Sequence, residues 1–83
     1  MKMPKKKYVD VVELVKQDGT VQLVKLFFDD EEFIISSSRF LGFRQGETGS
    51  GKCYEVVIND QTRYVYLEKD KYFVDAMVDV TEF

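Results

Sequence analysis

The segment from residue 53 to residue 74 constrains the fold of this chain more than any other part. It contains three runs rich in β-branched and aromatic residues, at 53–58, 63–68 and 72–74. Short polar turns separate these runs, with Asn-Asp-Gln-Thr at 59–62 and Lys-Asp-Lys before the last one. Strand-forming runs joined by short polar turns are typical of an antiparallel meander. The segment therefore predicts three consecutive antiparallel strands.

Side chains alternate between the two faces of a sheet, which gives this meander an apolar face and a mixed face. If the turn occupies 59–62, Val56 lies opposite Val65 and Tyr54 lies opposite Leu67. A register shifted by one residue would bury two glutamates, which is costly. The face predicted to be the core carries Tyr54, Val56, Ile58, Val65 and Leu67. The mixed face carries Glu55, Val57, Tyr64, Tyr66 and Glu68.

The rest of the chain shows further strand signals. Asp18-Gly19 is the strongest hairpin-turn signal in the sequence, and a break in the alternation near Val11 and Val12 predicts a β-bulge. The last alternating run is placed to pair with the first strand and close a barrel. We therefore expect an all-β fold, a small, antiparallel, strongly bent barrel of SH3-like or related type. The predicted strands lie near 8–16, 21–28, 32–36, 39–44, 53–59, 63–69 and 72–80.

Length and charge predict one folded domain with a basic arm. The chain has 83 residues, which suits a single domain. Residues 1–7 carry four Lys and are predicted to form a flexible basic N-terminal arm, while residues 8–83 form a single β-barrel domain. That body holds 8 basic and 15 acidic residues, which argues against a general nucleic-acid-binding surface. The arm fits a solvated terminus, with a nucleic-acid-binding tail as the alternative.

The composition excludes several kinds of chemistry. The chain has no His and one Cys, so Ser-His-Asp and Cys-His arrangements, an intramolecular disulfide and a Cys/His zinc site are impossible. Cys53 is expected to be a small half-buried strand residue rather than a reactive thiol. The carboxylate run at 29–32 lacks the spacing and central Gly of a calcium loop. We predict no enzyme activity, no metal and no cofactor.

One Gly-rich loop, at 45–52, approaches a phosphate-binding motif. Gly46, Gly51 and Lys52 match the spacing of a P-loop, but Cys53 replaces the Ser or Thr that binds magnesium. A P-loop also needs a helix after the Lys, and a β-branched run follows here. The loop is therefore predicted to be a mobile hairpin connection that binds no nucleotide.

The sequence predicts a cytoplasmic protein that has no membrane contact. The basic start resembles the first part of a signal peptide, but acidic residues at 10 and 13 interrupt the apolar region that would have to follow. No apolar run reaches transmembrane length. A single unpaired Cys fits a reducing compartment.

Several segments together resemble a family of short, uncharacterised bacterial proteins with a small β-barrel fold. These segments are Arg-Phe-Leu at 39–41, the Gly-rich loop, the strand at 54–58, Tyr-Val-Tyr-Leu-Glu at 64–68 and Tyr-Phe-Val at 72–74. The opening Val-Asp-Val-Val-Glu-Leu before Asp-Gly extends the resemblance over most of the chain. Tyr72 stands where Trp is usual in that family. The resemblance implies a bacterial cytoplasmic β-barrel and no assigned activity.

Two hypotheses of function follow from the aromatic residues. The first is a non-enzymatic binding module for a protein or peptide partner, or one that self-associates into a homo-oligomer, because exposed tyrosines favour interfaces. The alternative is a small nucleic-acid-binding barrel, in which aromatic rings stack on bases beside basic residues. These rings could instead simply cover the second side of a thin barrel. The aromatic residues expected at a contact are Tyr64, Tyr66, Phe40 and Phe43, and the basic ones are Arg39, Arg44, Lys52 and Arg63.

Overall fold

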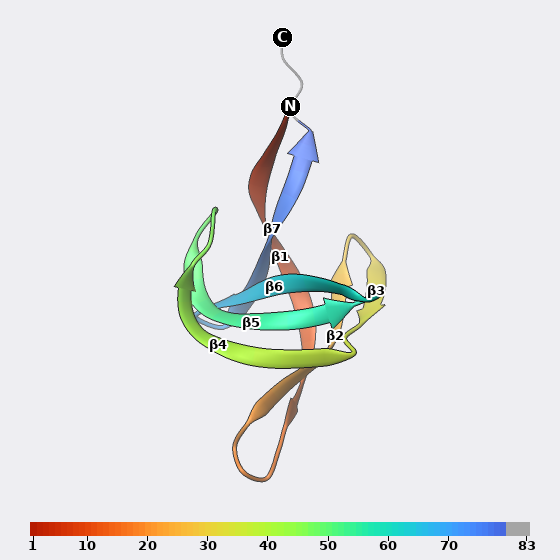
Figure 1. The fold of residues 1–83 in the computed structure, drawn as a ribbon, viewed down its shortest axis with the longest axis vertical. Helices are drawn as coiled ribbons and strands as arrows, with labels where there is room; N and C mark the ends of the chain where they lie inside the picture. The colour runs from red at the N-terminus through yellow and green to blue at the C-terminus, as the bar shows by residue number, and fades with distance from the viewer. Residues whose placement is uncertain (80–83) are drawn as a thin grey trace.

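The protein is a single, strongly curled antiparallel sheet, which confirms the predicted all-β class (Figure 1). This computed structural model describes residues 1–79. The sheet order is β3-β2-β1-β7-β6-β5-β4. Its strands are β1 (Lys2–Val15), β2 (Val21–Phe28), β3 (Glu31–Ile34), β4 (Ser37–Gln45), β5 (Ser50–Ile58), β6 (Gln61–Glu68) and β7 (Lys71–Asp79).

Curling brings the two ends of the sheet toward each other, so that the strands form a bent half-barrel. The backbone N–H of Leu23 on β2 donates to the hydroxyl of Ser38 on β4, at 2.9 Å. The N–H of Ser36, between β3 and β4, donates to the carbonyl of Val57 on β5, also at 2.9 Å. These bonds join the β3–β2 end of the sheet to the β5–β4 end.

Two bulges help to bend the strands. The register of β1 against β2 shifts between Val12 and Glu13, so the predicted bulge is present next to the expected position. The register of β4 against β5 shifts between Phe40 and Gly42, and Gly42 has a φ of +92°. A positive φ is readily adopted by Gly, and bulges increase the local bend and twist of a strand.

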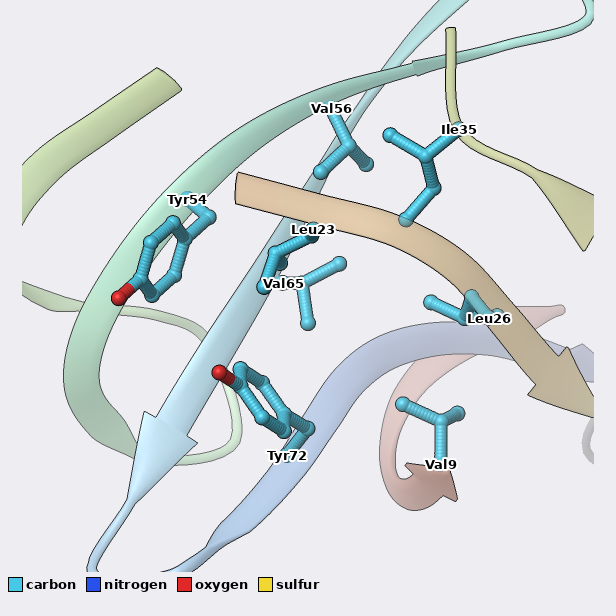
Figure 2. Packing of buried hydrophobic residues seen from close by; sticks show 8 residues of the cluster. All are labelled: Val9, Leu23, Leu26, Ile35, Tyr54, Val56, Val65 and Tyr72. Carbon is cyan, nitrogen blue, oxygen red and sulfur yellow. The ribbon is translucent and has the colours of Figure 1, made fainter. Parts of the chain in front are cut away.

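The main core fills the concave side of the sheet (Figure 2). Its side chains come from six segments, because the curl lets strands on opposite sides of the half-barrel face each other. Tyr54 and Tyr72 add two rings whose centroids are 6.3 Å apart. The buried cluster consists of Val9, Leu23, Leu26, Ile35, Tyr54, Val56, Val65 and Tyr72.

The register of the central hairpin differs from the predicted one by two residues. Tyr54 pairs with Val65, whereas the sequence predicted Val56 opposite Val65. The cause is a tighter turn, in which Asn59 and Asp60 both have positive φ, at 51° and 62°. Such a two-residue turn matches the twist of a hairpin. A shift of two residues keeps every side chain on its predicted face, so the predicted core residues on β5 and β6 remain on the concave side.

The N-terminal segment also differs from the prediction, because it is part of β1 rather than a free basic arm. Pairing between β1 and β7 runs from Lys2 opposite Asp79 to Val9 opposite Tyr72. The resulting two-stranded ribbon extends beyond the rest of the sheet (Figure 1), and the molecule measures 53 × 24 × 20 Å. Lys side chains are compatible with such a strand because their long stems lie along the sheet while the charge reaches water.

The core position of Val56 gives a direct test of the concave face. Val56 is fully buried, so Val56→Ala is expected to lower the free energy of unfolding by about 2 kcal/mol, from the loss of buried methyl groups and the cavity left behind. Val15→Ala is the control, because Val15 is 65% exposed. Urea unfolding of both variants checks this. Equal midpoints for the two would show that Val56 does not lie in the core.

Candidate functional site

The sheet opens between β6 and β7, and this opening is the candidate site. β6 pairs with β5 over nearly its whole length, from Gln61 to Leu67. It pairs with β7 only from Tyr66 opposite Phe73 to the turn that joins the two strands. A continuous ladder would place Tyr64 opposite Asp75, but in the described residues the two strands have already separated there.

The separated strands form the two walls of an apolar groove of about 640 Å³. This volume lies within the range of ordinary ligand sites. Residues 61–66 of β6 form one wall and residues 74–77 of β7 form the other. Side chains of the concave side extend the apolar lining into the groove. These are Leu26, Phe28, Phe33 and Ile58.

The β6 wall presents backbone groups as well as side chains. Ile58 and Gln61 flank the two-residue turn, so they form a hydrogen-bonded pair, and such pairs alternate along an antiparallel ladder. The backbone of Arg63 and Val65 is therefore directed to β5. The N–H and C=O groups of Thr62 and Tyr64 are directed into the groove.

The two tyrosines predicted at a contact both line this groove but differ in exposure. Tyr64 is 47% exposed. Tyr66 is half-buried and stacks on Phe73, with ring centroids 5.1 Å apart and an interplanar angle of 14°. Burial raises the pKa of the Tyr66 hydroxyl, with smaller contributions from Cys53 and Asp75. Tyr64 thus has the more exposed ring of the two, while Tyr66 supports the wall.

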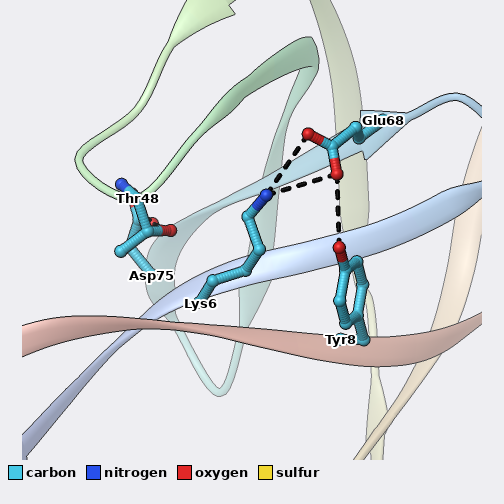
Figure 3. A network of polar contacts seen from close by, with 5 residues as sticks. All are labelled: Lys6, Tyr8, Thr48, Glu68 and Asp75. Carbon is cyan, nitrogen blue, oxygen red and sulfur yellow. Dashed lines mark hydrogen bonds and ion pairs between the residues drawn. The ribbon is translucent and has the colours of Figure 1, made fainter.

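Phe73 anchors a second cluster on the convex side of the sheet that the sequence did not predict. Its side chain is fully buried, beneath Tyr66, the edge of Tyr8 and the amine of Lys6, which lies 4.4 Å from the ring centroid. Lys6 Nζ lies 3.2 Å from both carboxylate oxygens of Glu68, and the Tyr8 hydroxyl donates to Glu68 at 3.3 Å (Figure 3). The signal in the sequence was an aromatic residue on the same face of three strands, namely Tyr8, Tyr66 and Phe73.

The Gly-rich loop joins β4 and β5 as the predicted hairpin connection and is hydrogen-bonded to β7, a contact that the sequence did not predict. The backbone N–H groups of Glu47 and Thr48 donate to the carboxylate of Asp75 at 3.0 and 3.2 Å, and the Thr48 hydroxyl also donates to it. Figure 3 shows Thr48 against Asp75. A Cβ at Gly46 would lie 2.9 Å from both Asp75 and Tyr66. The loop therefore covers the point where β6 and β7 separate. Strand β5 follows it, as predicted.

The four predicted aromatic residues do not form one patch. Phe40 lies on β4 against Tyr54, with ring centroids 5.2 Å apart, and is therefore on the concave side. Phe43 is 75% exposed. Neither residue lines the groove, which contains only Tyr64 and Tyr66 of the four.

Two of the four predicted basic residues lie beside the tyrosines. Arg39 and Arg44 line a shallow convex depression of about 410 Å³ together with Tyr64 and Tyr66. Arg39 forms an ion pair with Glu55 at 3.3 Å, in the same depression. Arg63 lines the groove instead, and Lys52 lines neither. Cys53 is fully buried at this depression, and its burial raises the pKa of the thiol.

Within residues 1–79, no group of three or more His, Cys, Asp or Glu side chains is arranged to hold a metal ion. That part of the chain also contains no helix with the length and apolar character needed to cross a membrane. The chain matches no protein-family model, and neither the curated proteins nor the solved structures contain a significant match. The resemblance to a family of short bacterial proteins thus stays a prediction.

Proposed function

We propose that this protein is a non-enzymatic binding module that takes up an extended peptide segment of a partner protein in the groove between β6 and β7. The observation that carries this proposal is the incomplete β6–β7 ladder, which leaves an apolar groove beside an unpaired strand edge. A natural sheet rarely leaves a strand edge open without covering or blunting it. An open edge inside an apolar groove is suited to an extended chain.

The composition of the groove favours a peptide over a nucleic acid. The aliphatic and aromatic lining provides area for apolar side chains, and Tyr64 adds a half-exposed ring at the rim. Tyrosine contributes contact area at a low cost in conformational entropy. Phosphate groups gain little from such a lining, because their affinity comes from Lys and Arg contacts and Arg63 is the one basic residue among the described lining residues.

The alternative, a small nucleic-acid-binding barrel, has one observation in its favour. Arg39 and Arg44 lie beside Tyr64 on the convex side, which is the arrangement expected of a base-stacking surface. Glu55 already pairs with Arg39 there, and the chain carries a net charge of −3. The peptide proposal therefore takes precedence.

The bacterial, cytoplasmic and SH3-like assignments stay predictions within this proposal. Their support is the single unpaired Cys, the resemblance described above and the small bent sheet. Self-association of this chain is the second form of the binding-module prediction, and the experiments below treat it as a separate outcome.

Binding of labelled extended peptides with alternating apolar and polar residues, measured by fluorescence anisotropy, tests the proposal. Tyr64→Ala is expected to weaken binding about tenfold, because it removes the exposed ring of the groove. Phe43→Ala is the matched control, since it removes an exposed aromatic ring that lies outside the groove.

Salt dependence separates the two candidate functions. Peptide binding is expected to weaken only modestly between about 0.05 M and about 0.5 M salt, because Arg63 is the one basic residue among the described residues that line the groove. Binding of an oligothymidylate would fall steeply over the same range, as counterion release requires. Tight oligothymidylate binding that weakens on Arg44→Ala would favour the nucleic-acid alternative. Peptide binding equally unaffected by Tyr64→Ala and Phe43→Ala would exclude the groove as the site.

A further inference from the structure

The groove combines a strand edge with two different rows of side chains, and this combination specifies a ligand. We propose that it binds one extended peptide strand that pairs with β6 through its backbone and carries an apolar residue and an acidic residue two positions apart. This inference rests on the proposed function and adds the mode of binding and the chemistry of the partner.

The strand edge supplies the backbone contacts. The hairpin register directs the N–H and C=O groups of Thr62 and Tyr64 into the groove, with no β7 partner in the described part of the chain. These are strong hydrogen-bonding groups that gain from a partner in apolar surroundings. Addition of a strand to such an edge is a known mode of peptide recognition, in which main-chain bonds give affinity and pockets for alternate side chains give specificity.

The first row of side chains favours an apolar residue. Extension of the β6–β7 register would place Val65 opposite Val74. Val65 is fully buried in the core, whereas Val74 is half-buried and lines the groove. Phe33 and Leu26 also line it. A peptide side chain beside Val74 and Phe33 would therefore contact mainly apolar groups, so that a charge there would be costly.

The second row, two residues further along, favours an acidic residue. The same extension would place Arg63 opposite Ala76, whose neighbour on β1 is Lys5. Arg63 donates to Gln61 at 2.6 Å, and among residues 1–78, whose side chains are described, neither Arg63 nor Lys5 takes part in an ion pair. A carboxylate in this row would contact Arg63, which lines the groove, and Lys5 would add a second positive charge from the far side of β7. Direct contact of a carboxylate with Arg is among the stronger polar interactions.

The occupant is a free peptide segment rather than the edge of a second folded copy. β7 lines the other side of the groove and pairs with β1. Figure 1 shows these two strands as a ribbon. An edge strand of a second folded copy would still be attached to the rest of its own sheet. The β1–β7 ribbon occupies the space that this attached sheet would need. The groove therefore has room for one strand with no sheet attached.

A proline substitution at position 62 tests the backbone contact. The N–H of Thr62 faces the groove and is not needed for pairing with β5, so Thr62→Pro removes a donor to the ligand at a position where a strand tolerates proline. Thr62→Ala, which keeps the N–H, is the matched control. The probe is the fluorescein-labelled peptide Thr-Thr-Ile-Thr-Glu-Thr-Thr. Thr62→Pro is expected to weaken its binding at least tenfold, and Thr62→Ala less than twofold.

Variants of the probe test the side-chain rows on the unmodified protein. Replacement of Glu by Lys in the peptide is expected to weaken binding at least tenfold, and replacement by Gln less so. Two further peptides carry N-methyl groups on alternate backbone nitrogens, one peptide on the odd positions and the other on the even positions. The peptide whose methyl groups face β6 is expected not to bind, and the other is expected to bind normally, because only every second N–H of a strand faces a given neighbour. This second measurement stands even if Thr62→Pro fails to fold.

The outcomes separate this inference from the proposed function. Binding that depends on Tyr64 but is indifferent to Thr62→Pro and to backbone methylation would overturn strand addition and leave the groove as the binding site. Absence of binding by this probe and by the whole alternating panel would overturn both. A dimer, detected by sedimentation, that dissociates on Thr62→Pro would show that a second copy occupies the edge and would also overturn the inference.

Discussion

Phe73→Ala is expected to lower the free energy of unfolding by about 3–5 kcal/mol, the range found for a Phe removed from a packed interior. Phe73 is the largest fully buried side chain of the described residues. Its ring stacks on Tyr66 and lies beneath the Lys6 amine. Truncation would leave a cavity and would also remove the apolar support of the Lys6–Glu68 ion pair. Guanidinium unfolding, followed by tyrosine fluorescence, measures the loss.

Phe43→Ala is the matched control for this prediction. The substitution is chemically identical, but Phe43 is 75% exposed, so the change in stability is expected to stay within about 0.5 kcal/mol. The free energy of unfolding of small domains is only about 5–15 kcal/mol, so the loss expected for Phe73→Ala is a large part of it. Phe73→Leu, with a smaller cavity, keeps the comparison measurable in that case. Similar losses for Phe73→Ala and Phe43→Ala would show that the convex cluster does not stabilise the fold.

The stability of the convex cluster matters because it explains how one small sheet can be packed on both sides. The concave core is assembled by the curl of the sheet, whereas the convex cluster is assembled by the Gly-rich loop and the β1–β7 ribbon. A Cβ at Gly49 would lie 2.8 Å from Lys6 Nζ and 3.3 Å from the Phe73 ring, so the loop packs directly on this cluster. The loop and the ribbon thus cover the second face of the sheet, which a helix often covers in a larger domain.

Alternation of side chains made the strands and their faces predictable from the sequence. The period of two is a local property, so the concave positions of Tyr54, Val56 and Val65 followed from it directly. The pairing partners did not follow, because they depend on the length of the turn. Asn59 and Asp60 can form a two-residue turn or part of a longer one, and a difference of two residues leaves the face pattern unchanged.

The groove itself could not have been predicted, because it depends on where one ladder stops. The β6–β7 ladder ends at Tyr66 and Phe73, where Asp75 is bonded to the Gly-rich loop instead of lying opposite Tyr64. That contact joins residues 27 and 28 positions apart in the chain. Local sequence patterns carry no information about it. The sequence likewise could not show that the predicted aromatic residues lie apart, with Tyr64 in the groove and Phe40 on the concave side.

Gly51 provides the second large effect, and its role is unrelated to the phosphate-binding motif that its spacing suggests. Gly51 is buried in β5, and a Cβ there would lie 2.4 Å from the carbonyl oxygen of Leu67 and 2.9 Å from its carbonyl carbon. Both atoms belong to the backbone of β6, so no side-chain rotation can relieve the clash. The glycine is required because two strands approach each other closely at this point.

Gly51→Ala is therefore expected to destabilise the protein by about 3 kcal/mol, at the upper end of the cost of overpacking. The conformational entropy that Ala removes from the unfolded chain offsets less than about 1 kcal/mol of this loss. Gly46→Ala is the matched control, because a Cβ there would lie 2.9 Å from side-chain atoms of Asp75 and Tyr66 and 3.1 Å from the Gly49 carbonyl oxygen, a less close approach to the backbone than at Gly51. Its cost is expected to be clearly smaller. Thermal unfolding compares the two variants, and amide exchange at Lys52 and Leu67, which pair next to the clash, localises the effect. Unchanged protection at those amides would contradict the close approach of β5 and β6 on which this prediction depends.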